Sequence, residues 1–137
     1  MTKSTKTMNI ITIDHIGIRV TDFQKSLHFY QQFGFISIRE DYQEHVFVMR
    51  HPSGITINLL DNADNNFDHN NVLMDIESRY PGYTHYAIAV KSISEMVTFL
   101  QSINCKITEG PVTFGNGQTS VFIRDPDMNV IEFTEHP

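Results

Sequence analysis

Asp14-His15-Ile16-Gly17-Ile18-Arg19-Val20 recurs later in the chain as Thr84-His85-Tyr86-Ala87-Ile88-Ala89-Val90. Each copy places a histidine at the head of a run with apolar residues at alternate positions, and a helix signal follows each run. The two histidines lie 70 positions apart, at 15 and 85. An internal repeat of this kind in a chain of 137 residues indicates two copies of one structural unit.

Both units predict the order strand, helix and three further strands, a βαβββ module. The first module, residues 10–62, has predicted strands at 10–20, 35–42, 45–50 and 55–60, and a helix from the capping box Thr21-Asp22-Phe23-Gln24 to Gly34. The second module, residues 83–135, has predicted strands at 83–90, 106–114, 119–124 and 130–135, and a helix from the capping box Ser92-Ile93-Ser94-Glu95 to Asn104.

Residues 63–82 between the modules are rich in Asp and Asn and poor in apolar side chains, so we expect a linker loop. A short helical piece or flap at Val72-Leu73-Met74 is the less favoured alternative. The linker joins the two modules into one expected domain over residues 1–137.

Composition limits the classes of function. The chain has 40% hydrophobic residues and no apolar run near the roughly 18 residues of a membrane span, so we expect a soluble protein without membrane contact. Residues 1–9 lack the apolar core of a secretory signal, which favours the cytoplasm. The net charge is −6 and the basic residues are scattered, which argues against nucleic acid as a partner. The single Cys105 excludes an internal disulfide.

Alternation along the strands predicts one small, polar face in each module, opposite the face that the helix covers. A sheet curled around a cavity needs such a face. The predicted fold class is therefore α+β, with two repeated βαβββ modules forming curled mixed sheets around a cavity. The residues assigned to the polar face are His15, Gly17, Arg19, Asn58, Leu60, Asn62, His85, Ala87, Ala89, Glu132, Thr134 and His136.

Two imidazoles and one carboxylate on this face, those of His15, His85 and Glu132, suggest a metal site with coordination positions open for substrate. Internal duplication brings equivalent positions together at a pseudo-twofold axis, which favours the metal site. The alternative is that each histidine forms hydrogen bonds in a polar core. The segment 50–58 aligns with 124–132, so Asn58 is the equivalent of Glu132.

The whole chain from about residue 10 to residue 135 resembles the vicinal oxygen chelate superfamily, which includes glyoxalase I, bleomycin-resistance proteins, fosfomycin-resistance proteins and extradiol dioxygenases. The motifs that carry the resemblance are His15-Ile16-Gly17-Ile18-Arg19-Val20, Ser26-Leu27-His28-Phe29-Tyr30, Phe33-Gly34-Phe35, Thr84-His85-Tyr86-Ala87-Ile88 and Asp125-Pro126-Asp127-Met128-Asn129-Val130-Ile131-Glu132. They are specific for the fold and less specific for the reaction, because this fold hosts several chemistries.

The resemblance implies one divalent metal ion per site, Ni, Zn, Mn or Fe, held by His15, His85 and Glu132. Glyoxalase I has a carboxylate at the position of Asn58, which offers only a weak carbonyl ligand and takes no proton. Glu132 is then the expected catalytic base. The function expected from the resemblance is a glyoxalase I-like, lactoylglutathione lyase-like isomerisation of a glutathione or other thiol adduct.

The glyoxalase reading assigns Arg19 and Asn62 to substrate binding, because each lies four residues after a metal-facing position. A salt bridge of Arg19 at a dimer seam, or to Asp14 or Asp61, is an equal alternative. A thiol transferase or an extradiol dioxygenase uses the same three ligands. Against the transferase, Phe122 stands where a tyrosine is expected and Gly17 where a threonine is expected.

A metal-free, bleomycin-resistance-like protein that binds a drug or other small molecule is the non-enzyme alternative. Its cleft walls would come from aromatic residues, although these more often belong to a core. The candidates are Phe47, Phe67, Tyr80, Tyr86, Phe114 and Phe122. Proteins that resemble this one commonly form homodimers, and we expect a homodimer here because an unpaired module leaves a sheet edge open.

Overall fold

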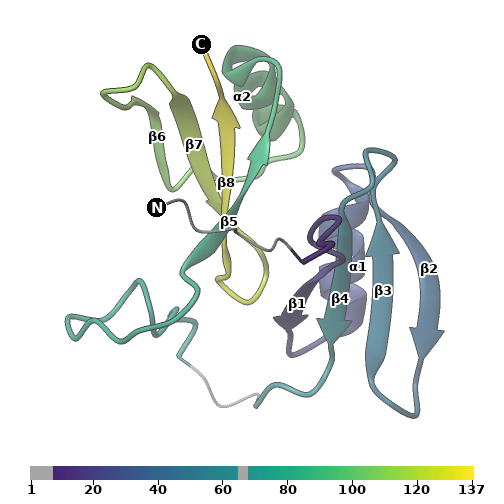
Figure 1. The fold of residues 1–137 in the computed structure, drawn as a ribbon. Helices are drawn as coiled ribbons and strands as arrows, with labels where there is room; N and C mark the ends of the chain where they lie inside the picture. The colour runs from purple at the N-terminus through teal and green to yellow at the C-terminus, as the bar shows by residue number, and fades with distance from the viewer. Residues whose placement is uncertain (1–7, 65–67) are drawn as a thin grey trace, which may run out of the picture.

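The computed structural model describes residues 8–64 and 68–137, and it contains two four-stranded sheets, each with one helix. Figure 1 shows the two sheets as separate bodies of strands, with the linker running between them. The predicted fold class is confirmed: two repeated modules form curled mixed sheets that do not close into a barrel. In the described residues no helix is long and apolar enough to cross a membrane.

The first module consists of β1 (Ile16–Arg19), α1 (Phe23–Gln31), β2 (Ile36–Asp41), β3 (Val46–Arg50) and β4 (Thr56–Leu60). Its strand order is β1-β4-β3-β2, with β1 parallel to β4 and the other pairs antiparallel. A parallel pair needs a connection that crosses over, and the chain returns to β1 only after α1, β2 and β3. Among the described strands β1 pairs only with β4, so it lies at the edge of its sheet.

The second module repeats this order with β5 (His85–Ala89), α2 (Ile93–Ser102), β6 (Glu109–Thr113), β7 (Thr119–Arg124) and β8 (Val130–Glu135). The strand order is β5-β8-β7-β6, and β5 runs parallel to β8. Glu132 of β8 lies beside Ala87 of β5 and Phe122 of β7. β5 therefore occupies the same edge position as β1.

One hydrophobic core joins the helix-covered faces of the two sheets. The ring of Phe33, just after α1, stacks on Phe133 of β8 at 5.6 Å and meets Phe99 of α2 edge to face at 5.6 Å. The Tyr30 hydroxyl of α1 donates to the Asp125 carboxylate at 2.9 Å, across the boundary between the modules. Because the apolar faces share this core, the polar faces of both sheets turn away from it.

The predicted alternation of faces is confirmed by burial in β1 and β5 and over Ile57–Leu60 of β4, but burial does not alternate in β8. In β1, Ile18 is buried whereas Gly17 and Arg19 are exposed, and in β4, Ile57 and Leu59 are fully buried whereas Asn58 is half-buried. The same period-2 pattern recurs in β5, whereas Val130 to Thr134 of β8 are all buried, so that Glu132 and Thr134 are buried on the polar side.

Three predictions about element ends are wrong. The first strand begins at Ile16 rather than at residue 10, and Ile10, Ile11 and Ile13 are at least 80% exposed. Residues 106–108 precede β6 instead of forming its start. Thr21 does not cap α1: Asp22 does, by accepting from the Gln24 N–H, because the Thr21 hydroxyl is bonded to Asp127 of the other module at 2.7 Å.

The predictions for the second helix and its flanking strands hold more closely. Ser92 caps α2 by accepting from the Glu95 N–H at 3.1 Å. Asn104 follows the helix with φ 55°, a left-handed conformation that asparagine tolerates and that stops a helix. The described residues between β4 and β5 contain turns and bends and no helix, so the alternative of a helical piece at Val72-Leu73-Met74 is wrong.

Candidate functional site

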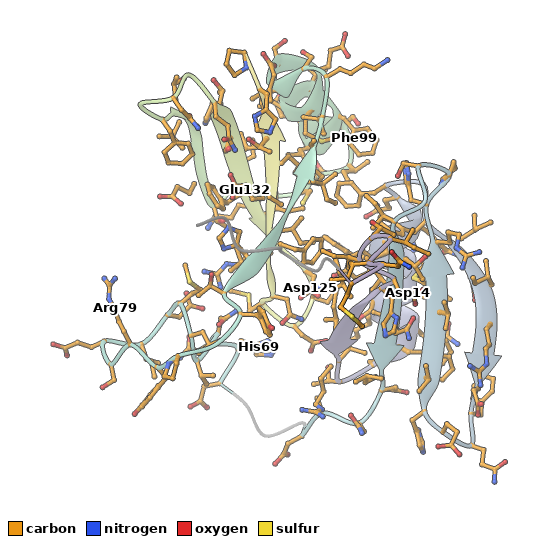
Figure 2. The ribbon with its side chains drawn as sticks, viewed as in Figure 1. Asp14, His69, Arg79, Phe99, Asp125 and Glu132 are labelled. Atoms are coloured by element: carbon orange, nitrogen blue, oxygen red, sulfur yellow. The ribbon has the colours of Figure 1, made fainter. Side chains whose placement is uncertain are left out.

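The polar face of the second sheet carries a contact between two predicted site residues. His85, the first residue of β5, lies 3.0 Å through Nε2 from Oε1 of Glu132, which is buried in β8. The other carboxylate oxygen, Oε2, accepts a 2.6 Å hydrogen bond from the Ser120 hydroxyl of β7. Figure 2 shows Glu132 within the second sheet, away from the first module. The carboxylate is therefore held at both oxygens.

A chain of hydrogen bonds supports this carboxylate. The single hydroxyl hydrogen of Ser120 is used on Glu132, so the 3.0 Å contact with Thr134 is donated by the Thr134 hydroxyl. Thr134 in turn accepts from the Gln118 side-chain amide. On the other side, the Thr84 hydroxyl lies 2.8 Å from Nδ1 of His85. A metal at Nε2 requires the hydrogen of a neutral His85 to lie on Nδ1, which then donates to the Thr84 hydroxyl.

The bond from Ser120 to Glu132 is not predicted from the sequence, although a usable signal exists. Glu132 pairs with Phe122 and Thr134 pairs with Ser120 in the antiparallel β7–β8 ladder. Directly paired residues share a face, and their diagonal neighbours lie within side-chain reach. Counting back two residues from Phe122 therefore places a hydroxyl next to the carboxylate. The position needed the register of β7 on β8, which the residues of β7 alone do not supply.

The polar face of the first sheet carries the other predicted residues. His15, immediately before β1, is exposed, and its Nδ1 lies 2.7 Å from the neighbouring Asp14 carboxylate. Arg19 donates through Nε to the side-chain oxygen of Asn62 at 3.0 Å, which joins the two residues assigned to substrate binding. The alternative salt bridge of Arg19 to Asp14 or Asp61 is not formed in the described residues. Asn58 lies between Gly17 and Val48 at the centre of this face.

The structure does not bring His15 together with His85 and Glu132 within one chain. In residues 8–64 and 68–137, no group of three or more His, Cys, Asp or Glu side chains is placed to hold a metal ion. His15 and His85 line the same cavity, but their side chains do not form one group with Glu132. Pseudo-symmetry correctly matched the positions but did not fix the distance between them.

The pair that does form fits a divalent metal. Imidazole nitrogen and carboxylate oxygen are ordinary ligands of Zn, Ni, Mn and Fe. Ligand atoms at about 2.0–2.2 Å from such an ion and at right angles to each other lie about 3 Å apart, as Nε2 of His85 and Oε1 of Glu132 do at 3.0 Å. The second-sphere bonds from Thr84 and Ser120 are of the kind that orient such ligands. One chain thus supplies two of the three predicted ligands at one place.

A cavity of about 850 Å³ lies between the starts of β1 and β5. Its lining includes His15, Arg19, His85 and Tyr86, and the linker residue Leu73 forms part of another wall. Its volume falls within the range of small-molecule pockets. Glu132, Asn58, Asn62 and Phe122 are not part of its lining. Both candidate histidines therefore border a hollow of the size of a small ligand.

The turn that leads into β8 is held by Asp125. One carboxylate oxygen accepts from the backbone N–H groups of Asp127 and Asn129, and the other accepts from the Asn129 side chain and the Tyr30 hydroxyl, all at 2.9 Å. Burial raises the pKa of Asp125, while these donors act in the opposite direction. Burial also raises the pKa of Tyr86. Asp125 therefore fixes where β8 begins and, with it, the position of Glu132.

The aromatic candidates for a drug-binding cleft do not gather in one place. Phe47 is buried and stacks on Phe23 with ring centroids 3.7 Å apart, so it belongs to the core and its assignment to a cleft is wrong. Tyr80 and Phe114 are exposed at 60% and 44%. Phe122 packs edge to face against the His85 ring at 6.0 Å. Phe67 lies outside the described residues.

The comparisons with known proteins agree with this fold. The model of the Glyoxalase/Bleomycin resistance protein/Dioxygenase superfamily matches residues 12–133, and the chain belongs to this superfamily. The superfamily includes enzymes such as lactoylglutathione lyase, and its members commonly bind a divalent metal and small-molecule substrates. No curated protein matches the sequence.

Among solved structures, a glyoxalase/dioxygenase from Nostoc punctiforme is 21% identical, covers 98% of this chain and 99% of its own, and has a TM-score of 0.71. The lactoylglutathione lyase from Agrobacterium tumefaciens is 20% identical, with coverages of 93% and 96% and a TM-score of 0.68. The bleomycin resistance determinant encoded on the transposon Tn5 is 15% identical, with coverages of 92% and 98% and a TM-score of 0.68. At these identities the likeness shows the shared fold.

Proposed function

We propose that the protein is a metal-dependent small-molecule enzyme that catalyses a glyoxalase-like isomerisation of a thiol adduct. The observation that carries the proposal is the His85–Glu132 pair, 3.0 Å apart and supported by Ser120 at 2.6 Å. A protein that only binds an apolar drug has no use for a carboxylate buried on the polar face of a sheet, because burying an ionised group is costly unless it is bonded or bound to a metal.

We infer that a second copy of the chain completes the site with its His15. Among the described residues, β1 pairs only with β4 and β5 only with β8, so each sheet has a free edge next to its candidate histidine. Free edges are normally covered. Large apolar side chains are exposed beside these edges, among them Ile11 at 95% and Tyr83 at 100%. Such surfaces favour association, and a homodimer of twofold symmetry yields two equivalent sites.

In this proposal His85 and Glu132 of one chain and His15 of the other hold the metal, with Asn58 as a weak oxygen ligand. When bound, a divalent metal polarises two neighbouring oxygens of the substrate and stabilises the negative charge that develops on them. Glu132 acts as general base: its carboxylate takes the proton from one carbon and returns it to the adjacent carbon. Asn58 cannot share this task, because an amide does not ionise.

The protein's own residues also hold the substrate in this proposal. Ser120 donates to Oε2 of Glu132 at 2.6 Å and so fixes the orientation of the carboxylate. Arg19, oriented by Asn62 at 3.0 Å, presents a planar cation suited to the carboxylate of a glutathione-type adduct. Phe122 packs against the His85 ring with centroids 6.0 Å apart.

The test is the metal content of the protein purified without chelator, beside His85→Ala and a His136→Ala control. His136 is exposed at the chain end and has no assigned role. The proposal expects about one divalent metal per chain, lost in His85→Ala and kept in His136→Ala, together with hemithioacetal isomerase activity that follows the metal. No metal binding after reconstitution with Ni, Zn, Mn and Fe would overturn it and leave a binding protein.

A further inference from the structure

We propose that the cavity between the starts of β1 and β5 binds an apolar group of the substrate, an aromatic ring or a branched aliphatic chain, and that Leu73 of the linker sets the size of this group. The inference rests on the proposed function and names its substrate class: a thiol adduct whose carbonyl part carries a bulky apolar group. The cavity of about 850 Å³ has room for such a ligand, since its volume lies in the upper part of the range for small-molecule sites.

Apolar side chains from three strands line the cavity. They are Ile16 and Ile18 of β1, Tyr86 of β5 and Val130 of β8. Burying an apolar group of the ligand against such walls is favourable in proportion to the area removed from water. His85 precedes Tyr86 and borders the same cavity, so a group bound against these walls lies next to a proposed metal ligand.

Polar groups in the lining already have partners within the protein. The Asp127 carboxylate accepts from the Thr21 hydroxyl at 2.7 Å and from the Thr21 N–H at 3.1 Å. The Asn129 side chain donates to the Asp125 carboxylate at 2.9 Å. An apolar ligand leaves these bonds intact and strands no donor or acceptor, whereas a highly polar ligand would have to compete for them.

Leu73 closes one wall of the cavity, and the linker holds it there from two sides. Its N–H donates to the Asn71 side-chain oxygen at 2.9 Å, and the Asn71 side-chain amide donates to the Met128 carbonyl of the second module at 3.2 Å. On the other side Leu73 lies against Gly82, where an added Cβ would come within 2.8 Å of Leu73 Cδ1. The linker runs from there directly into β5 (Figure 1). Leu73 is therefore a fixed wall of the cavity.

Leu73 and the next residue, Met74, form a matched pair for an experiment. Leu73 is half-buried and lines the cavity, whereas Met74 is 46% exposed and is not among the described residues of the lining. Both belong to the turn that Asn71 and Asp75 hold by the 2.7 Å bond from the Asn71 N–H. A large side chain at position 73 should fill the cavity, whereas the same side chain at position 74 should extend into solvent.

The experiment is an NMR titration of amide shifts in the full-length protein with benzyl alcohol and with 2-naphthylmethanol. 1,2-Propanediol is the polar ligand control and is expected to bind far more weakly. Leu73→Trp is expected to weaken the binding of 2-naphthylmethanol about tenfold or more, because the indole occupies the space of the second ring. Leu73→Ala is expected to change the preference toward the larger probe. Met74→Trp is expected to bind both probes as the parent protein does.

Unchanged affinity for 2-naphthylmethanol in a folded Leu73→Trp variant would overturn the inference, as would an equal loss in Met74→Trp. A shift of Leu73→Trp from dimer to monomer with unchanged probe affinity would assign Leu73 to contacts between chains and would also overturn it. His85→Ala separates the two proposals, since it is expected to lose the metal and to keep both probes. Metal binding by a parent protein that binds neither probe would overturn this inference alone.

Discussion

The Ser120 hydroxyl donates a 2.6 Å hydrogen bond to Oε2 of Glu132, and both groups are buried. This bond sets which carboxylate oxygen faces His85, because Oε1 is then the one left for the 3.0 Å contact. A carboxylate fixed in this way is a pre-oriented ligand and base, whereas a free one would rotate about its terminal bond. The bond makes Ser120 a positioning residue for the proposed metal site.

We therefore expect Ser120→Ala to lower the metal affinity by about ten- to a hundredfold, the range seen when a partner of a metal ligand is removed. Calorimetry with Zn and the visible spectrum of the Co-loaded protein measure the affinity and the coordination. Ser26→Ala is the matched control: its hydroxyl is buried and has no hydrogen-bond partner in the described residues. Equal affinities in the two variants would show that Ser120 does not orient Glu132.

Tyr30→Phe tests the bond between the modules. It removes the 2.9 Å donor to Asp125 and is expected to lower the free energy of unfolding by about 2 kcal/mol at neutral pH, the range for hydrogen bonds to charged groups. Tyr42→Phe is the control, because Tyr42 bonds to Glu40 on the exposed surface. Urea unfolding of both variants provides the measurement. A smaller loss in Tyr30→Phe than in Tyr42→Phe would contradict the account.

The cost of Tyr30→Phe should also depend on pH. Burial raises the pKa of Asp125 and the Tyr30 bond acts to lower it, so the variant is expected to have a still higher folded pKa. A carboxyl with a raised folded pKa loses stability as pH rises from its unfolded value, about 3.9, through the folded pKa. The variant therefore loses more than the parent over this window, and the difference between them should grow with pH. A difference that shrinks with rising pH would refute this assignment.

The linker is held by Asp75, which accepts two 2.8 Å bonds from Arg124 and one 2.7 Å bond from the Asn71 N–H. The Arg124 hydrogen bond, the largest cause, lowers the pKa of Asp75 to about 2. A lowered folded pKa contributes stability above the unfolded value, about 3.9, which is lost as pH falls toward 2.

Asp75→Asn is expected to speed amide exchange at residues 71–75, with little change in global stability. Glu77→Gln, an exposed linker control, is expected to leave exchange unchanged, and equal exchange in both variants would argue against the clamp.

Much of the fold could be predicted because its determinants are local. The period-2 pattern of β4 places Asn58 on the other face of the sheet from Ile57 and Leu59. The start of α2 at Ser92 and its end before Asn104 each depend on a few adjacent residues. The wrong ends are those where tertiary contacts decide. Thr21 fails as a cap because Asp127, far away in sequence, takes its hydroxyl, and residues 10–15 have strand-forming residues but no strand beside them.

The site could be predicted only in part, for a related reason. Alternation assigns Glu132 and His15 to faces, and the pseudo-repeat equates their positions, but neither gives the distance between the modules. That distance depends on contacts between the modules, such as those of Phe33 with Phe99 of α2 and Phe133 of β8. The contact of Ser120 with Glu132 was not predicted because it depends on the register of β7 on β8.

The central claim is that a complete metal site needs His85 and Glu132 from one chain and His15 from another. It is tested most directly with a heterodimer, isolated through two different tags, of a His15→Ala chain and a His85→Ala chain. One of its two sites then carries both changes and the other carries none. We predict one metal ion bound at full affinity per heterodimer, although neither variant alone binds metal with that affinity. A heterodimer without a full-affinity site, or a protein that forms no dimer, would contradict the account.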